Sequence, residues 1–526
     1  MNDKFELIAK TFQGLEGVLA DELKEIGAEN VEVGRRMVSF DGDKYMMYKA
    51  NFCCRTALRI LKPFYKFKAS STDQLYEEVK KYDWDKVLSP NQTFAIDSTV
   101  YSEEFRHSKF VTYRVKDAIA DYFNEKYGKR PSIRLTGADI IMNVHIAGDA
   151  VTLSLDSSGE SLHKRGYRVA STEAPINEVL AAGLLKLAGW NGDCNLVDPM
   201  CGSGTFLIEA ALIAANIYPG VFRNSFAFER WRDFDSEMFD AIYNDDSNER
   251  EFAFHIYGSD ISPKAVDIAK ANIKNASVAK YVSVEVKPFQ KIEKAPEAGM
   301  LITNPPYGER IVLDDMVDFY HLIGDSLKST FKGYKAWIIG PSNELFDNVG
   351  LKPSLRYPIL NGSLECEFRK YAVFAGRLAD FREKGGIVKT EEELKQMAEK
   401  HRFKQHREFK ERLDADKEEQ QPYFGVDDND EDDIRTFRFR SLERRSSSEA
   451  AKRGGRERHR FSNHDSGLND PRDNRRGYER KPYGKNERRA FDRDRAERRG
   501  YASDRRDSDR RGNLSDRRRM FGDDDG

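Results

Sequence analysis

The feature that most constrains the fold of this chain is a glycine-rich loop between an apolar strand pattern and an apolar helix pattern. The loop runs Asp198-Pro-Met-Cys-Gly-Ser-Gly-Thr205, with Leu196 and Val197 before it and apolar residues at helical spacing after it. Gly202 and Gly204 allow backbone amides to approach a ligand where a side chain would collide. Amides at a helix start favour an anionic group such as a carboxylate or phosphate. The string therefore predicts a strand–loop–helix unit that can bind a ligand.

The same loop argues against a nicotinamide dinucleotide as that ligand. A dinucleotide fingerprint would need a third glycine near position 207, where Leu207 stands. Taken alone, the loop is also compatible with an ordinary strand-to-helix turn.

A second string, Asn304-Pro-Pro-Tyr307, follows an expected strand at 299–303. The Asn side-chain carbonyl and a prolyl backbone carbonyl can both accept hydrogen bonds from one NH2 group, while the Tyr ring stacks on the flat group that carries it. Open α/β sheets bind ligands at the carboxyl ends of their strands. A surface turn is the alternative for this string alone, but its co-occurrence with the glycine loop favours a site.

Together the two strings resemble the class I S-adenosylmethionine (SAM) methyltransferases that act on exocyclic or amide nitrogens. The resemblance implies SAM as the cofactor, an acceptor amine held by the second string, and no metal. The implied catalytic residues are Asn304, Pro305, Pro306 and Tyr307. The implied SAM contacts in the loop are Asp198, Pro199, Cys201, Gly202, Gly204 and Thr205.

Further candidate cofactor contacts lie outside the loop. Asp260 ends an expected strand at 256–260, where it can bond the ribose hydroxyls of a nucleoside, cap the helix expected at 263–275, or do both. Ile261, next to it, is a further candidate.

The resemblance adds three more cofactor-side residues. Pro175 and Ile176 belong to an expected helix at 174–182, which lies over the SAM pocket in related enzymes. Those enzymes frequently carry an acid at the position of Pro288 to accept the adenine amine, and the neighbouring Phe289 is a candidate for stacking on adenine instead.

The first 168 residues look like an α+β module. Residues 1–62 are predicted to form a ferredoxin-like unit, with helices at 15–26 and 45–60, and residues 63–168 resemble a THUMP domain. THUMP domains are associated with RNA modification enzymes, so the resemblance implies RNA as a partner. The implied RNA contacts are His107, Lys109, Arg114, Lys116, Lys164, Arg165 and Arg168. The basic string 159–168 could instead be a solvated linker.

The fold class predicted from these patterns is α/β. A Rossmann-like methyltransferase domain at 169–377 follows the ferredoxin-like and THUMP module. A charged helical and acidic linker at 378–440 leads to a disordered Arg- and Asp-rich tail at 441–526. Residues 451–526 hold 24 Lys and Arg against 16 Asp and Glu, whereas the whole chain has a net charge of −2. Such a tail could contact RNA or simply remain solvated.

Cysteine usage and hydropathy indicate a cytoplasmic location. The five cysteines show no metal-binding or disulfide spacing, and no segment has the length and apolarity of a signal core or a membrane span.

The chain is most similar in layout to the THUMP-containing rRNA guanine-N2 methyltransferases of bacteria, and the string Asn361–Phe368 supports this resemblance. It implies methylation of the exocyclic N2 amine of a guanosine in 23S rRNA. Three alternatives stay open: a tRNA guanine-N2 methyltransferase, methylation of adenine in DNA or glutamine in a protein, and a ribosome-assembly protein that binds RNA through its Arg-rich tail.

Overall fold

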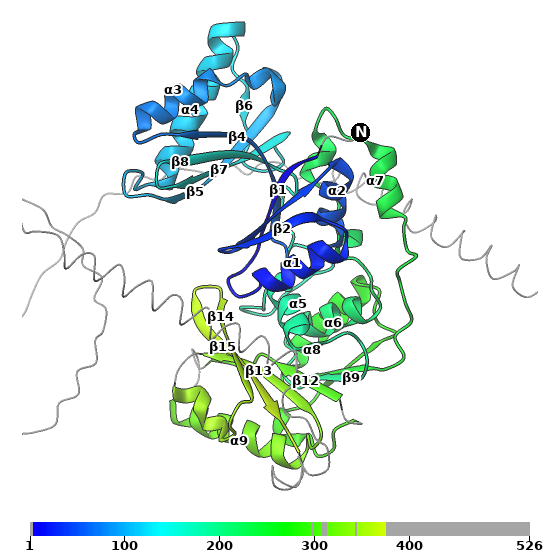
Figure 1. Cartoon of the computed structure of the whole chain (residues 1–526). Coiled ribbons are helices and arrows are strands. Elements are labelled where there is room, and N and C mark those ends of the chain that lie inside the picture. The colour runs from blue at the N-terminus through cyan, green and yellow to red at the C-terminus, as the bar shows by residue number, and fades with distance from the viewer. Residues whose placement is uncertain (1–3, 297–298, 308–312, 342–343, 375–526) are drawn as a thin grey trace, which may run out of the picture. The chain divides into compact units, whose positions relative to one another are not determined.

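The computed structural model describes residues 4–296, 299–307, 313–341 and 344–374 (Figure 1). Two sheets organise them, one of eight strands and one of seven. The expected linker at 378–440, the expected tail at 441–526 and the last residues of the expected methyltransferase domain lie outside the described ranges. No helix within those ranges is long and apolar enough to cross a membrane.

The first sheet is continuous because one long strand, β4 (Arg59–Lys68), serves both of its halves. Residues 59–61 pair with β1 (Phe5–Lys10), and residues 61–68 pair with β8 (Ala150–Asp156). The expected division between residues 62 and 63 therefore falls inside a strand. The strand order is β2-β3-β1-β4-β8-β7-β5-β6. The other strands are β2 (Glu29–Gly34), β3 (Met37–Gly42), β5 (Thr93–Tyr101), β6 (Ser132–Ile133) and β7 (Ile140–Ala147).

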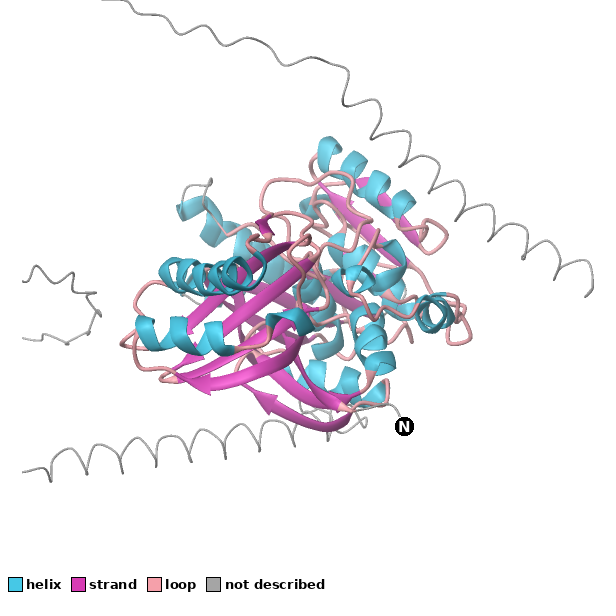
Figure 2. Cartoon of the chain, turned by 90° about the horizontal axis from the view of Figure 1, so that it is seen from above, coloured by secondary structure: helices cyan, strands magenta, loops and turns pink. Residues whose placement is uncertain are grey.

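Helices lie against the strands (Figure 2). Their apolar side chains contribute to a shared core. The helices are α1 (Glu16–Glu25), α2 (Lys44–Cys53), α3 (Thr72–Lys81) and α4 (Ser108–Tyr127). The prediction of a helix over 45–60 is wrong at its carboxyl end. Cys54 adopts an extended backbone (φ −67°, ψ 126°), and the chain then enters β4, whose pairing on both sides outweighs local helix propensity.

The second sheet has the predicted Rossmann-like architecture. Its order is β11-β10-β9-β12-β13-β15-β14, with the first five strands parallel and β15 antiparallel to both of its neighbours, β13 and β14. One face packs on α5 (Glu178–Leu187), α6 (Thr205–Ala214) and α8 (Pro263–Asn275), and the other on α9 (Leu313–Ser329). The strands are β9 (Asn195–Asp198), β10 (Ile256–Asp260), β11 (Val282–Val286), β12 (Gly299–Thr303), β13 (Lys335–Pro341), β14 (Leu355–Asn361) and β15 (Leu364–Ala372).

Local sequence signals set some helix starts and misplace others. Helix α8 begins at Pro263 as predicted, because the Ser262 side chain caps it and proline suits the first turn. The helix expected from residue 174 begins only at Glu178, where the Asn177 side chain accepts a hydrogen bond from Val179 N. Ala174 has a φ of +50°, which a helix does not allow.

A segment between α6 and β10 joins the first apolar core. It contains α7 (Ser236–Tyr243) and a group of aromatic residues that pack on α2. The Phe228 ring stacks on Tyr48 with centroids 4.3 Å apart. The two sheets are therefore connected by packing as well as by the chain.

Candidate active site

The glycine loop lies at the carboxyl end of β9, between Asp198 and the start of α6 at Thr205. Gly202 and Gly204 have φ values of +53° and +81°, which favour glycine. A methyl group added at Gly204 would lie 3.2 Å from Ala269 Cβ on α8, so this glycine permits close helix packing. A methyl group at Gly202 would meet only the Thr172 hydroxyl, at 3.7 Å. Gly202 is thus the loop glycine with room beside it for a ligand.

Two carboxylates flank this loop. Asp198 is 1% exposed and accepts hydrogen bonds from Thr303 Oγ1 at 2.8 Å and from Met200 N at 3.2 Å. Burial raises the pKa of Asp198 to about 7, and the charge of Asp260 adds to the rise. Asp260 accepts from Gly202 N and from Ser262 N, each at 2.9 Å. Carboxylates at this edge suit the ammonium and ribose hydroxyl groups of SAM.

The structure uses the loop amides differently from the sequence-based prediction. The Gly202 amide already donates to Asp260, and the Gly204 amide donates to the Cys201 carbonyl. In this structure, these two amides are therefore already engaged within the protein. Cys201 and Thr205 are buried with the loop.

Ile261 and Phe289, two apolar candidates for cofactor contacts, differ in their exposure. Ile261 is 66% exposed next to Asp260, as a residue that covers a cofactor ring should be. Phe289 is only 5% exposed, and its ring stacks on Phe331 within the core that supports α9. The prediction that Phe289 stacks on adenine is contradicted, because the apolar core already occupies its ring.

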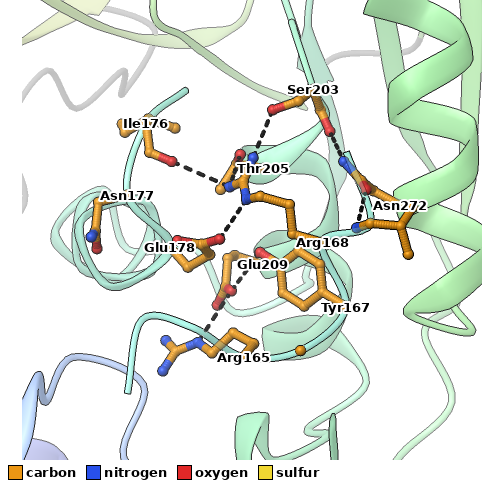
Figure 3. Close-up of polar contacts among 12 residues, drawn as sticks. Arg165, Tyr167, Arg168, Ile176, Asn177, Glu178, Ser203, Thr205, Glu209 and Asn272 are labelled. Carbon is orange, nitrogen blue, oxygen red and sulfur yellow. Dashed lines mark hydrogen bonds and ion pairs between the residues drawn. The ribbon is translucent and has the colours of Figure 1, made fainter. Parts of the chain in front are cut away.

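The Arg168 side chain donates hydrogen bonds to two residues of the glycine loop (Figure 3). Its Nη1 donates to Ser203 Oγ at 2.9 Å, and its Nη2 donates to Thr205 Oγ1 at 2.8 Å and to the Ile176 carbonyl at 3.4 Å. Its Nε donates to Glu178 Oε1 at 2.6 Å. With these partners, the side chain fixes the cofactor loop and is not presented to RNA. The RNA contact predicted for Arg168 is therefore corrected.

Arg165 is also buried, at 2% exposure, and contacts protein groups only. Its guanidinium donates to Glu209 on α6 (Figure 3). It also donates to the backbone carbonyls of Leu162 and Arg55. Tyr167 donates its hydroxyl to the same Glu209 Oε1 at 2.9 Å. An RNA phosphate cannot reach a guanidinium in this position, so the RNA contact predicted for Arg165 is wrong.

Asn272 on α8 is a loop-supporting residue that the sequence did not reveal. Its Nδ2 donates to the carbonyls of Ser203 and Ala170, each at 3.0 Å, and its Oδ1 accepts from Val169 N at 2.9 Å. A single asparagine within a helix pattern carries no local signal for such a role. Pro175 and Ile176 follow the segment that Asn272 contacts at Val169 and Ala170. Pro175 is exposed and Ile176 is buried.

The second string lies at the same edge of the sheet as the glycine loop. β12 is the parallel neighbour of β9, and Thr303, which donates to Asp198, is followed directly by Asn304. The Tyr307 hydroxyl donates to Asn304 Oδ1 at 2.5 Å, and Asn361 Nδ2 donates to that hydroxyl at 3.3 Å. Pro305 is buried and Pro306 exposed. The structure thus brings both predicted strings together through one hydrogen bond.

The remaining predicted RNA contacts differ in their availability. His107 and Lys109 are exposed at the start of α4. Arg114, Lys116 and Lys164 form ion pairs with Asp73, Asp117 and Glu160, respectively. The exposed rings of Phe110 and Tyr113 lie on the same helix, one turn apart. Tyr127, at the end of the same helix, is also exposed, whereas Phe123 is buried.

Three family models match successive parts of the chain. They are the RlmL ferredoxin-like domain at residues 6–61, the THUMP domain at 69–156 and the RMKL-like methyltransferase domain at 165–370.

Individual proteins show the same similarity. A Synechocystis protein named provisionally as an RNA methyltransferase is 40% identical over 369 residues, covering 70% of this chain and 96% of its own. The ribosomal RNA large subunit methyltransferase K/L of Syntrophotalea carbinolica is 37% identical, covering 71% of this chain and 54% of its own. This chain thus spans about half the length of the K/L enzyme.

A solved structure supports the cofactor assignment. A protein described provisionally as a methyltransferase, in complex with SAH, is 29% identical with a TM-score of 0.63, covering 72% of this chain and all of its own. The glycine loop, the paired carboxylates and the second string agree with that assignment. The chain therefore belongs to the SAM-dependent RNA methyltransferase family that joins a THUMP domain to an RMKL-like methyltransferase domain.

Proposed function

We propose that this protein methylates the exocyclic N2 amine of a guanosine in large-subunit rRNA, in the cytoplasm. The observation that carries the proposal is the junction of the two loops. Thr303 bonds Asp198 beside the cofactor loop, and the next residue is Asn304, the predicted acceptor for the amine. A nucleophile bound by Asn304 would therefore lie close to the methyl donor.

The chemistry needs positioning more than a strong base. When bound, SAM supplies a methyl group carried on a positively charged sulfur. The guanine N2 lone pair is delocalised into the ring, so the nitrogen is a poor nucleophile. Acceptors at Asn304 Oδ1 and the Pro305 carbonyl would hold the two amine protons, orient the lone pair and stabilise the positive charge that develops on nitrogen. The Tyr307 ring would hold the base out of its stack.

The choice of RNA as the substrate rests on the module that precedes the site. We assign RNA binding to the THUMP domain at 63–168, which follows the ferredoxin-like unit at 1–62, and chemistry to 169–377. The relatives named as ribosomal RNA large subunit methyltransferases K/L support rRNA over tRNA. The names of these relatives give no support to a DNA or a protein substrate.

Nucleoside mass spectrometry of rRNA and tRNA fractions, from cells with and without the gene, tests the substrate. Loss of N2-methylguanosine from large-subunit rRNA alone is the expected result. Loss of N2-methylguanosine from tRNA would leave the proposed reaction in place but make tRNA the substrate. If no RNA methyl mark changed, a protein glutamine substrate or a non-catalytic role in ribosome assembly would replace the proposal.

The Asn304→Ala variant tests the site. We expect turnover to fall by at least about 100-fold, because the amine loses the acceptor that orients it. SAM binding, measured by calorimetry, should change little, because the cofactor loop is untouched. Asn224→Ala, which removes an exposed asparagine outside the THUMP domain, is the matched control and should retain full activity. Equal activity in Asn304→Ala and the parent protein would refute the assignment.

A further inference from the structure

We propose that Asn361 is a positioning residue that directs a hydrogen-bond relay through the Tyr307 hydroxyl to the Asn304 carboxamide. This inference rests on the proposed role of Asn304 as the acceptor for the substrate amine. It assigns a task to the string Asn361–Phe368, which the function described so far leaves unused.

The chemistry of the three groups allows the relay to run in one direction only. Asn361 Nδ2 can only donate, and it lies 3.3 Å from the Tyr307 hydroxyl. The hydroxyl oxygen therefore accepts that bond, and its single proton is directed to Asn304 Oδ1, 2.5 Å away. The Cys366 thiol also interacts with the hydroxyl, but sulfur is a weaker acceptor than the carboxamide oxygen. Each bond polarises the next, so the relay holds its members more firmly than separate contacts would.

The direction of the relay decides which end of the Asn304 carboxamide occupies the acceptor position. A carboxamide presents an acceptor oxygen at one end and a donor NH2 at the other. A proton from Tyr307 selects the oxygen and uses one of its two lone pairs. The second lone pair remains for a proton of the substrate amine. The opposite orientation would present a donor to that amine and repel it.

The surroundings keep the Tyr307 hydroxyl protonated and in place. Burial raises the pKa of Tyr307 well above its usual range, so the group remains a donor at neutral pH. Its ring packs against the apolar core that includes Ile359 and Cys366 of the β14–β15 hairpin. Asn361 is the last residue of β14 and pairs with Leu364 across the hairpin turn. A two-stranded hairpin thus carries the first group of the relay.

The same hairpin contacts the ferredoxin-like unit, in the loop between β1 and α1. A methyl group added at Gly14 would lie 3.2 Å from both Ile359 Cδ1 and the Pro358 carbonyl oxygen. Gly14 belongs to the segment between β1 and α1. The relay therefore begins on an element that is held between the acceptor site and the ferredoxin-like unit.

Two substitutions test the relay in the full-length chain, with total rRNA from cells lacking the gene as the methyl acceptor. Asn361→Asp keeps the size of the side chain but turns the donor into an acceptor, so the Tyr307 proton turns toward Asp and away from Asn304. Tyr307→Phe keeps the ring and removes the hydroxyl. We expect each to lower kcat about tenfold, the usual effect of one hydrogen bond, with KM for rRNA and Kd for SAM within about twofold.

Non-additivity separates a relay from two independent structural effects. Because both substitutions remove the same donor to Asn304, the double variant should be no slower than Tyr307→Phe alone. Ser363→Ala, at the exposed turn of the same hairpin, is the matched control and should keep the parent kcat. Should Asn361→Asp fail to fold, Asn361→Ala replaces it, with the same expected tenfold loss and the same non-additivity.

The possible failures are distinguishable. If Asn361→Asp keeps the parent kcat, or if the double variant loses about 100-fold, the relay is refuted while an inactive Asn304→Ala variant leaves the proposed function standing. If Asn304→Ala is fully active, the proposed function and the relay are both refuted.

Discussion

The carboxyl of Asp198 binds its proton far more tightly in the folded protein than an exposed aspartate does. Burial raises its pKa from 3.8 to about 7, and Asp260 contributes through its negative charge. Hydrogen bonds from Thr303 and Met200 oppose the rise. Since the folded state binds the proton more tightly than the unfolded state, the stabilising contribution is fully present below pH 3.8. It is lost as the pH rises through about 7.

We expect Asp198→Asn to raise the free energy of unfolding at pH 8 by at least about 1 kcal/mol. Asparagine keeps an acceptor for Thr303 but removes the buried charge. The gain should shrink toward pH 4, where Asp198 in the parent protein is already neutral, and thermal denaturation at several pH values measures it. The same variant should bind SAM more weakly, because the ammonium group loses a carboxylate. A stability difference that does not vary with pH would contradict the explanation.

The junction of the glycine loop, α6 and α8 depends on a glycine for packing as well as for conformation. Gly204 has a positive φ, and an added methyl group would lie 3.2 Å from Ala269 Cβ on α8. Gly128 ends α4 with a φ of +63° but has nothing within 4 Å of such a methyl group. Comparison of the two positions separates backbone strain from overpacking.

We expect Gly128→Ala to destabilise the protein by about 1 kcal/mol, the cost of the left-handed backbone alone. Gly204→Ala should cost about 2–4 kcal/mol, because crowding against α8 adds to that strain. The lowering of Tm in thermal denaturation reports both. Equal shifts in Tm for the two variants would contradict the crowding explanation, because they would mean that α8 accommodates the methyl group without a loss of stability.

The attachment of the ferredoxin-like and THUMP module to the methyltransferase domain runs through buried polar groups and not through a solvated linker. Arg165 connects Arg55 of the first module to Glu209 on α6, and Arg168 continues directly to the glycine loop. β4 makes one sheet of the ferredoxin-like and THUMP parts. Lys109 on α4 lies farther away and is exposed, so it stays a predicted RNA contact.

Lys109→Ala should weaken rRNA binding several-fold without changing SAM affinity. A lysine that contacts a phosphate also releases a counterion, so the slope of log K against log salt should decrease by about 1. Lys126→Ala is the matched control, because Lys126 lies at the other end of α4 and is engaged by Asp85. Filter binding at several salt concentrations measures both variants. An unchanged slope for Lys109→Ala would remove this residue from the RNA interface.

The sequence by itself determined those features whose causes lie within a few consecutive residues. The strand–glycine loop–helix unit, the capped start of α8 at Pro263 and the acceptor string at Asn304 depend on local periodicity, capping and side-chain chemistry. Parallel strands with their carboxyl ends at one edge then follow from the alternation of strands and helices.

Only the tertiary structure decided the roles of residues whose partners are distant along the chain. Arg165 and Lys164 are adjacent basic residues, yet one is buried against Glu209 and the other is exposed. Phe289 fills a core, and Asn361 reaches Tyr307 from a hairpin more than fifty positions away. Local sequence cannot specify such outcomes, because burial and hydrogen-bond partners depend on which elements pack together in three dimensions.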